Sequence, residues 1–156
     1  MMYKIVEDTR NQKGKHDLKH EFFDSVGVGM VRSKLPFGDY APVPPVSIDT
    51  KRDIDEIAGN ICGAKHKRFI NECKAARDAG CQLIILVENR CGISTLSEVH
   101  TWQNPRSVYS PNCVQGDRLQ RAMETIQERY GVIFRFCVPE DAGRIILETL
   151  EAYGYG

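Results

Sequence analysis

Four charged side chains lie close together within residues 38–55, namely Asp39, Asp49, Lys51 and Asp55. Side chains alternate along an extended strand, so Asp49 and Lys51, two residues apart in VSIDTK, would point to one face. If the run that begins at Asp39 pairs antiparallel with this strand, its carboxylate approaches Asp49 from the side. Two carboxylates and one ammonium group would then converge on one point.

Two carboxylates at short distance repel each other unless a cation lies between them. Mg²⁺ and Mn²⁺ prefer oxygen ligands and accept few protein donors. We therefore expect Asp39 and Asp49 to be metal ligands, with the backbone carbonyl of Thr50 as an additional one. Such an ion could stabilise charge on a phosphate and activate water, while Lys51 orients that water and the scissile phosphate. The pattern predicts hydrolysis of a phosphodiester.

Each of these charges has a competing interpretation as a solvated turn residue. For Asp55 we expect a role in positioning Lys51 or a second metal ion, and helix capping is the alternative. Asp53 is itself a good candidate for the cap of the helix that begins with IDEIAGNI.

The same residues resemble the core motif G-D-x(n)-E-R-K-x-x-x-D of the XPF-type structure-specific endonuclease domain, a branch of the PD-(D/E)XK nuclease superfamily. Gly38-Asp39 stands at G-D, Asp49-Thr50-Lys51 at E-R-K, and Asp55 at the final acid. Asp in place of Glu at 49 shortens the arm by one methylene but keeps a metal-binding carboxylate. Thr50 replaces an arginine. Because side chains alternate along a strand, the side chain at position 50 would point away from the metal.

Two further segments carry the resemblance. IVEDTR is similar to the family's opening strand, V-D-x-R-E, and places Asp8 and Arg10 on its acidic and basic positions, with Asn11 where the family has an acid. Asp8 could bind metal through water or orient Arg10, and a strand-end turn residue is the alternative. KRFINECKAARDAGCQLIILVEN resembles the next helix and strand, with Arg68 on a recurrent arginine and Glu88 at the strand end.

Basic residues near the start of that helix are candidates for DNA contacts. Lys65, Lys67 and Arg68 could bind phosphates where exposed backbone amides already favour anions. A solvated helix end explains the two lysines equally well. Arg10 is the remaining basic position that the resemblance assigns to DNA.

The resemblance implies a metal-dependent endonuclease that cuts DNA, with branched or flap DNA as the expected substrate. A domain of this size suits repair or recombination in a phage or mobile element. The alternative is a non-catalytic DNA-binding or scaffold subunit that partners an active nuclease; such relatives usually lose the acids or the lysine, and this chain keeps them. A remoter alternative is hydrolysis of another phosphoester. The tandem helix-hairpin-helix domain of many relatives is not recognised here, so we expect DNA affinity and dimerisation, as a homodimer or with a partner subunit, to come from this domain or from another protein.

The elements that must position these residues follow from the hydrophobic periodicity. The sequence predicts a strand in YKIVED, a helix in KHDLKHEFFDSV, and three extended runs before Asp53 that suggest an antiparallel meander. Helices and strands then alternate, and CQLIILVEN is apolar enough for a strand covered on both faces. We expect an α/β fold in which a mixed central sheet has helices on both faces, as in restriction-endonuclease-like domains.

The 156 residues suit a single nuclease domain over 1–156, with a long connection over 90–115 that could form a short helix in STLSEVHTW, capped by Ser94 or Thr95. Lys plus Arg equals Asp plus Glu, at 21 each, so DNA binding must depend on local clusters. No signal peptide or membrane span is evident. We therefore expect a cytoplasmic protein without a membrane partner, near the nucleoid and in the host cytoplasm if phage-encoded. His16 and His20 have the spacing of a metal pair but no third ligand, which favours a polar helix face.

Overall fold

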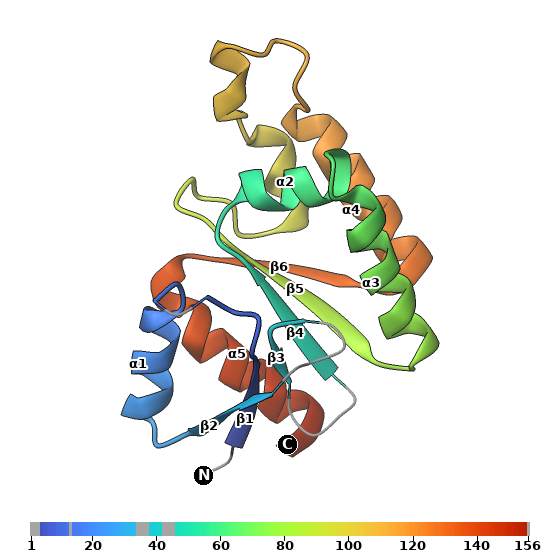
Figure 1. The fold of residues 1–156 in the computed structure, drawn as a ribbon. Helices are drawn as coiled ribbons and strands as arrows, with labels where there is room; N and C mark the ends of the chain where they lie inside the picture. Colours follow the sequence, from blue (N-terminus) through green and yellow to red (C-terminus); the bar gives the residue numbers. More distant parts are fainter. Residues whose placement is uncertain (1–3, 13, 34–37, 42–45, 156) are drawn as a thin grey trace.

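The computed structural model describes residues 4–12, 14–33, 38–41 and 46–155. Six strands form one sheet in the order β2-β1-β3-β4-β5-β6 (Figure 1). The strands are β1 (Lys4–Asp8), β2 (Gly29–Ser33), β3 (Tyr40–Ala41), β4 (Val46–Lys51), β5 (Gln82–Glu88) and β6 (Ile133–Cys137). Strands β4, β5 and β6 are parallel, whereas β3 is antiparallel to both of its neighbours, β1 and β4. The predicted mixed sheet is confirmed.

The predicted antiparallel meander is wrong for β2, which lies outside β1 and parallel to it. The helix α1 (Asp17–Ser25) connects these two strands. A helix between neighbouring strands carries the chain back to the starting end, so the second strand runs parallel to the first. The other edge of β1 therefore pairs with β3, and this pairing places the end of β1 beside Asp39.

Helices cover both faces of the sheet, as predicted. One face packs against α2 (Ile54–Cys62), α3 (His66–Asp78) and α4 (Gly116–Tyr130), and the other against α1 and α5 (Ala142–Leu150) (Figure 1). β5 shows why its sequence is continuously apolar: Leu83 and Ile85 belong to the first core, and Ile84 and Leu86 to the second.

Local capping explains how β4 passes into α2. The side chain of Asp53 accepts a hydrogen bond from the backbone N–H of Glu56, with an oxygen–nitrogen distance of 2.7 Å. Asp53 is therefore the N-cap, as predicted, and α2 starts three residues after Lys51.

The connection over 90–115 contains two 3₁₀ helices, η1 (Leu96–Thr101) and η2 (Pro105–Val108). Glu98 forms a capping box with Thr95 at the start of η1, which confirms the predicted short helix and one of its two candidate caps. Trp102 follows η1 and is buried in the core beneath α2 to α4. Shorter elements are η3 (Pro139–Asp141) and a π-helical turn (Glu151–Tyr155). Among the described residues, no helix is both long enough and apolar enough to span a membrane.

Candidate active site

Asp39 is brought to β4 by a short antiparallel pairing. The backbone N–H of Asp39 donates to the carbonyl of Ile48 at 2.7 Å, and Tyr40 lies opposite Ile48 in the sheet. Gly38 has a φ of 77°, and a Cβ at this position would lie 2.2 Å from the Ser47 hydroxyl. The glycine of the G-D pair is therefore required by both conformation and space.

The Asp39 carboxylate contacts the acidic strand directly. Its Oδ2 accepts hydrogen bonds from the backbone N–H and the hydroxyl of Thr50, both at 2.7 Å, and the carboxyl is also within hydrogen-bonding reach of Asp49. The expectation that position 50 points away from the metal-binding acids is wrong for Asp39. Asp39 reaches β4 from the neighbouring strand, so strand alternation does not separate its carboxylate from Thr50.

Asp49 and Lys51 lie together on the opposite side of β4 from Thr50, as predicted. The Lys51 ammonium is 3.1 Å from Asp49 Oδ2 and 6.0 Å from the centre of the Phe69 ring on α3. Burial, followed by the charge of Asp39, raises the pKa of Asp49 to about 7, and burial also raises the pKa of Asp39. Burial would lower the pKa of Lys51, but the Asp49 carboxylate leads the acidic groups that outweigh it, so this pKa rises and the lysine is a cation.

Sequence reasoning missed a third acid, Glu72, which α3 brings to the same place. Its Oε1 accepts a hydrogen bond from the backbone N–H of Gly38 at 2.9 Å. Burial and then the charge of Asp49 raise the pKa of Glu72 to about 7. Helical spacing puts Glu72 beside the buried face of α3, three residues after Phe69 and next to Cys73, but it does not show that Glu72 reaches Gly38.

These side chains line a cleft of about 600 Å³. Basic residues from two parts of the chain line it: Arg10 follows β1, and Lys65 and Arg68 lie at the start of α3. Asp8 also lines the cleft; its backbone N–H donates to the carbonyl of Asp39 at 2.7 Å, and its carboxylate pairs with Arg10 Nε at 2.6 Å. Asp8 therefore lies next to Asp39, as a role near the metal position requires, and next to Arg10, as a role in orienting that arginine requires.

Two residues predicted for the site lie elsewhere. Of the described residues, neither Asp55 nor Lys67 lines the cleft. Asp55 instead accepts two hydrogen bonds from the guanidinium of Arg106, at 3.0 and 3.2 Å, and so connects α2 to η2. In the structure, therefore, the carboxylate of Asp55 pairs with Arg106 rather than with Lys51, and Asp53 rather than Asp55 is the helix cap. Lys67 is exposed and corresponds to the solvated alternative.

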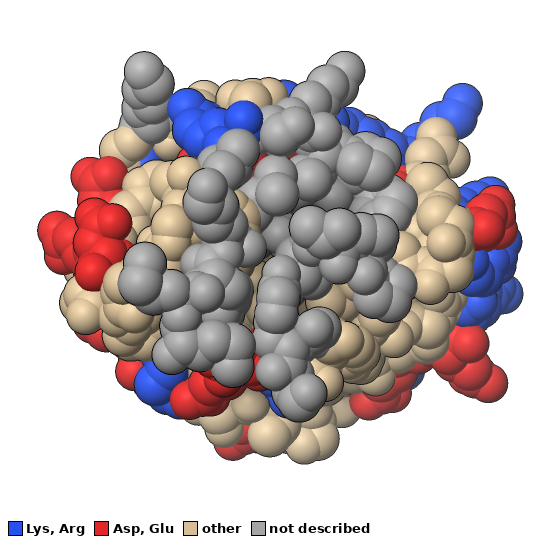
Figure 2. Space-filling view, turned by 90° about the horizontal axis from the view of Figure 1, so that it is seen from below, with Lys and Arg blue, Asp and Glu red and all other residues tan. Residues whose placement is uncertain are grey.

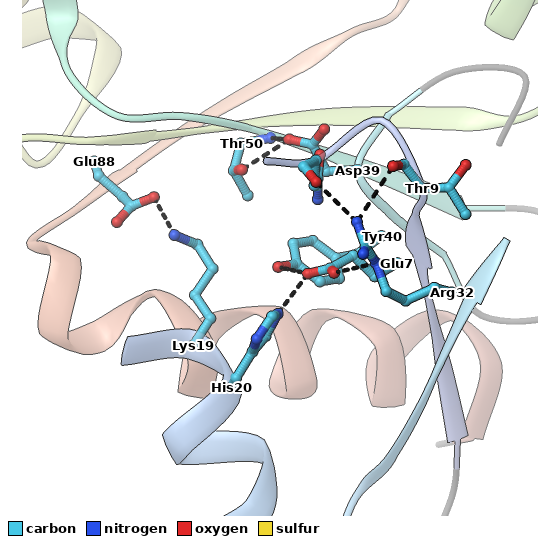
Figure 3. Close-up of polar contacts among 10 residues, drawn as sticks. Glu7, Thr9, Lys19, His20, Arg32, Asp39, Tyr40, Thr50 and Glu88 are labelled. Carbon is cyan, nitrogen blue, oxygen red and sulfur yellow. Dashed lines mark hydrogen bonds and ion pairs between the residues drawn. The ribbon is translucent and has the colours of Figure 1, made fainter. Parts of the chain in front are cut away.

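On the α1 side, a buried ion pair closes the cleft. Lys19 Nζ lies 2.5 Å from Glu88 Oε2 at the end of β5, and both residues line the cleft (Figure 3). Burial raises the pKa of Glu88 despite the nearby lysine. The strand-end glutamate of the sequence motif thus holds α1 against the sheet.

A second polar network supports the end of β1. Buried Glu7 accepts a hydrogen bond from the hydroxyl of Tyr40 at 2.7 Å, contacts His20 Nε2 at 2.5 Å, and pairs with Arg32 Nε at 3.1 Å (Figure 3). Arg32 also donates to the carbonyl of Asn11 at 2.8 Å, which holds the turn after β1. His20 is thus engaged in this network through Glu7, and its ring centre lies 6.5 Å from that of His16.

The donor set of the cleft fits a divalent cation. The buried carboxylate of Asp49 and the partly buried carboxylate of Asp39 lie close together with raised pKa values, and a cation between them would offset both their repulsion and their loss of hydration. Across the described ranges, no group of three His, Cys, Asp or Glu side chains is arranged to hold an ion. Two carboxylates, with water and substrate oxygens completing the shell, match the way proteins bind Mg²⁺.

The face drawn in Figure 2 gives no broad electrostatic signal. Figure 2 shows acidic and basic side chains interspersed around one face of the molecule, without an extended patch of either sign among the residues coloured there. This agrees with the formal net charge of zero. The basic residues of the cleft are therefore candidates for recognition of a polyanion.

The mixed sheet, the G-D turn and the D-x-K strand together define an α/β domain of the restriction-endonuclease-like class. The family model of the ERCC4 domain matches residues 7–148, so the chain belongs to the ERCC4 domain family. This confirms the resemblance to XPF-type nuclease domains on which the sequence predictions depended. No curated protein shows a significant match to the chain.

Two solved structures share the fold. XPF from Aeropyrum pernix has a TM-score of 0.68 and 17% identity, over 97% of this chain and 61% of that one. XPF from Aeropyrum pernix in complex with DNA has the same TM-score and 18% identity, over 97% of this chain and 64% of that one. This chain thus corresponds to less than two thirds of the length of these proteins.

Proposed function

We propose that this protein is a Mg²⁺- or Mn²⁺-dependent endonuclease that hydrolyses phosphodiester bonds in DNA. The observation that carries the proposal is that Thr50 of β4 holds the Asp39 carboxylate next to Asp49, with the Lys51 ammonium 3.1 Å from Asp49, inside a cleft that basic residues also line. Membership of the ERCC4 domain family supports nuclease chemistry.

Each side chain has a definite task. Asp39 and Asp49, with the backbone carbonyl of Thr50, would hold the ion, which supplies charge stabilisation at the phosphate and a more acidic water. Lys51 is a cation and so acts as a hydrogen-bond donor, orienting the attacking water and stabilising the negative charge that develops on the phosphate. Asp8 orients Arg10 at the rim.

DNA would be held by the basic residues that line the cleft. Arg10, Lys65 and Arg68 line the cleft and would contact phosphates near the cleaved bond. The related Aeropyrum pernix structure with DNA supports nucleic acid as the ligand. We propose branched, fork or flap DNA as the substrate, with a homodimer or a partner subunit supplying further DNA contacts, in repair or recombination.

The test is cleavage of fork, flap and linear DNA in Mg²⁺, Mn²⁺ or EDTA. Wild-type protein should cut in either metal and not in EDTA, and Lys51→Ala and Asp49→Asn should reduce the rate by at least about 100-fold. Lys67→Ala is the matched control, because it removes a lysine outside the cleft. DNA binding without metal-dependent cutting of any substrate would favour the non-catalytic subunit instead, and cutting that survives both active-site substitutions would exclude the mechanism.

A further inference from the structure

Glu72 connects helix α3 to the turn that carries Asp39. The Glu72 side chain is partly buried in the cleft, and its Oε1 lies 2.9 Å from the backbone nitrogen of Gly38. The bond spans 34 positions of sequence, so it joins two parts of the chain that local structure would not hold together.

The hydrogen bond holds the backbone at Gly38, the residue just before Asp39. Gly38 is in the left-handed region, and the next amide, that of Asp39, donates to Ile48 at 2.7 Å. Two consecutive amides are therefore fixed, one by Glu72 and one by β4. Together they set the direction from which the Asp39 carboxylate reaches Thr50.

A direct role of Glu72 as a third metal ligand has less support. The described residues contain no trio of acidic, His or Cys side chains arranged around one point, although Glu72, Asp39 and Asp49 are all among them. One oxygen of Glu72 is already engaged by the Gly38 amide. The carboxylate is thus placed to orient the turn rather than to bind the ion.

We propose that Glu72 is a positioning residue, which holds the Gly38–Asp39 turn so that Asp39 faces Asp49 across the metal position. The proposal extends the proposed function, since it explains how one ligand is oriented. The hydrogen bond needs an acceptor oxygen but not a charge. Glu72→Gln keeps a carbonyl oxygen of the same reach, whereas Glu72→Ala and Glu72→Met remove it.

Two measurements test this role. Amide hydrogen exchange of Gly38, read by NMR with Ile85 in β5 as the reference for global stability, reports the bond itself. Mn²⁺ affinity, measured by calorimetry with Asp39→Asn as the reference for loss of a ligand, reports its consequence. Asp78→Ala, which removes an exposed acid from the same helix, is the matched control.

We expect Glu72→Ala to speed exchange of Gly38 about tenfold and to weaken Mn²⁺ binding by a similar factor, with Ile85 unchanged. Glu72→Gln and Asp78→Ala should stay within about twofold of wild type in both measurements. If the alanine variant does not fold, Glu72→Met takes its place as the variant without an acceptor oxygen and is compared with Glu72→Gln in the same two measurements. Loss of Mn²⁺ affinity in the glutamine variant as large as in the alanine variant would overturn the proposal, and so would unchanged exchange of Gly38 in the alanine variant. If wild-type protein bound no Mn²⁺, the metal mechanism would fail, while the exchange of Gly38 would still decide the role of Glu72.

Discussion

Thr50 donates both its backbone N–H and its hydroxyl to a single oxygen, Oδ2 of Asp39, at 2.7 Å each (Figure 3). The two bonds come from one residue of β4, so they fix the Asp39 carboxylate relative to the strand that carries Asp49 and Lys51. Both bonds also favour the ionised form of a carboxylate whose pKa is raised by burial. The threonine that replaces the family's arginine therefore has a specific contact in the cleft.

Thr50→Val should raise the metal requirement of the enzyme. Valine keeps the shape of threonine and the backbone bond, but it removes the hydroxyl donor and so makes ionisation of Asp39 less favourable. We expect the Mn²⁺ concentration for half-maximal cleavage to rise about tenfold. Thr50→Ser, which retains a hydroxyl, is the control and should stay close to wild type. Equal metal requirements in the valine and serine variants would show that the hydroxyl contributes nothing.

Asp49 should make the metal-free protein less stable as the pH rises. Its folded-state pKa is about 7, against an ordinary value of 3.8, so between these values the folded state keeps a proton that the unfolded state has released. The stabilisation is fully present below about pH 4 and is lost as the pH rises through about 7. One such proton corresponds to a slope of about 1.4 kcal/mol per pH unit.

Asp49→Asn should flatten this slope in urea unfolding measured from pH 4 to 8 in EDTA. His16, whose pKa burial lowers to about 4, contributes with the opposite sign, but it is present in both proteins and cancels in the difference. Excess Mg²⁺ should restore stability to the wild type above pH 7 and have little effect on the variant. Parallel pH profiles of the two metal-free proteins would contradict the raised pKa.

The sequence predicted the parts of this site that depend on strand geometry. Alternation placed Asp49 beside Lys51, and the expected antiparallel pairing of the neighbouring run brought Asp39 to the same strand. Glu72 was missed because its contact depends on how α3 packs over β4, which spacing alone does not specify. Asp55 was misplaced because its partner, Arg106, lies 51 positions away in an irregular connection. The position of β2 was missed because the sequence does not show which strand β2 pairs with. It pairs in parallel with β1 instead of joining an antiparallel meander with β3 and β4.

The buried pair of Lys19 and Glu88 should depend on both partners. Lys19→Met leaves a carboxylate buried without its cation, and Glu88→Leu leaves the ammonium buried, so each should lower the free energy of unfolding by about 3–5 kcal/mol. The double variant has two apolar side chains of similar size and should recover most of that loss. Urea unfolding at pH 7 provides the double-mutant cycle. Additive losses in the double variant would mean that the two residues act independently.

Arg68 should contribute to DNA binding in a way that Lys67 does not, although the two are adjacent in α3. Arg68 lines the cleft and Lys67 does not, so only the arginine is placed to contact a phosphate inside it. Binding of fork DNA in EDTA, measured over a range of salt concentrations, should be weaker for Arg68→Ala, with the slope of log K against log salt reduced by about one. Lys67→Ala should leave both affinity and slope near wild type. Similar losses in the two variants would indicate a general charge effect rather than a contact in the cleft.

Asp55 is the residue for which the sequence motif and the structure differ most. The motif assigns it to the active site, whereas the structure pairs it with Arg106. Asp55→Asn should keep the cleavage rate within about twofold of wild type, since the side chain lies outside the cleft and its partner is exposed. Arg106→Gln removes the other half of the same pair and should match it both in cleavage rate and in a small loss of thermal stability. A large loss of cleavage in Asp55→Asn with normal activity in Arg106→Gln would show that Asp55 contributes to catalysis, as the motif predicts. Matched behaviour of the two variants would assign Asp55 to the attachment of η2 to α2.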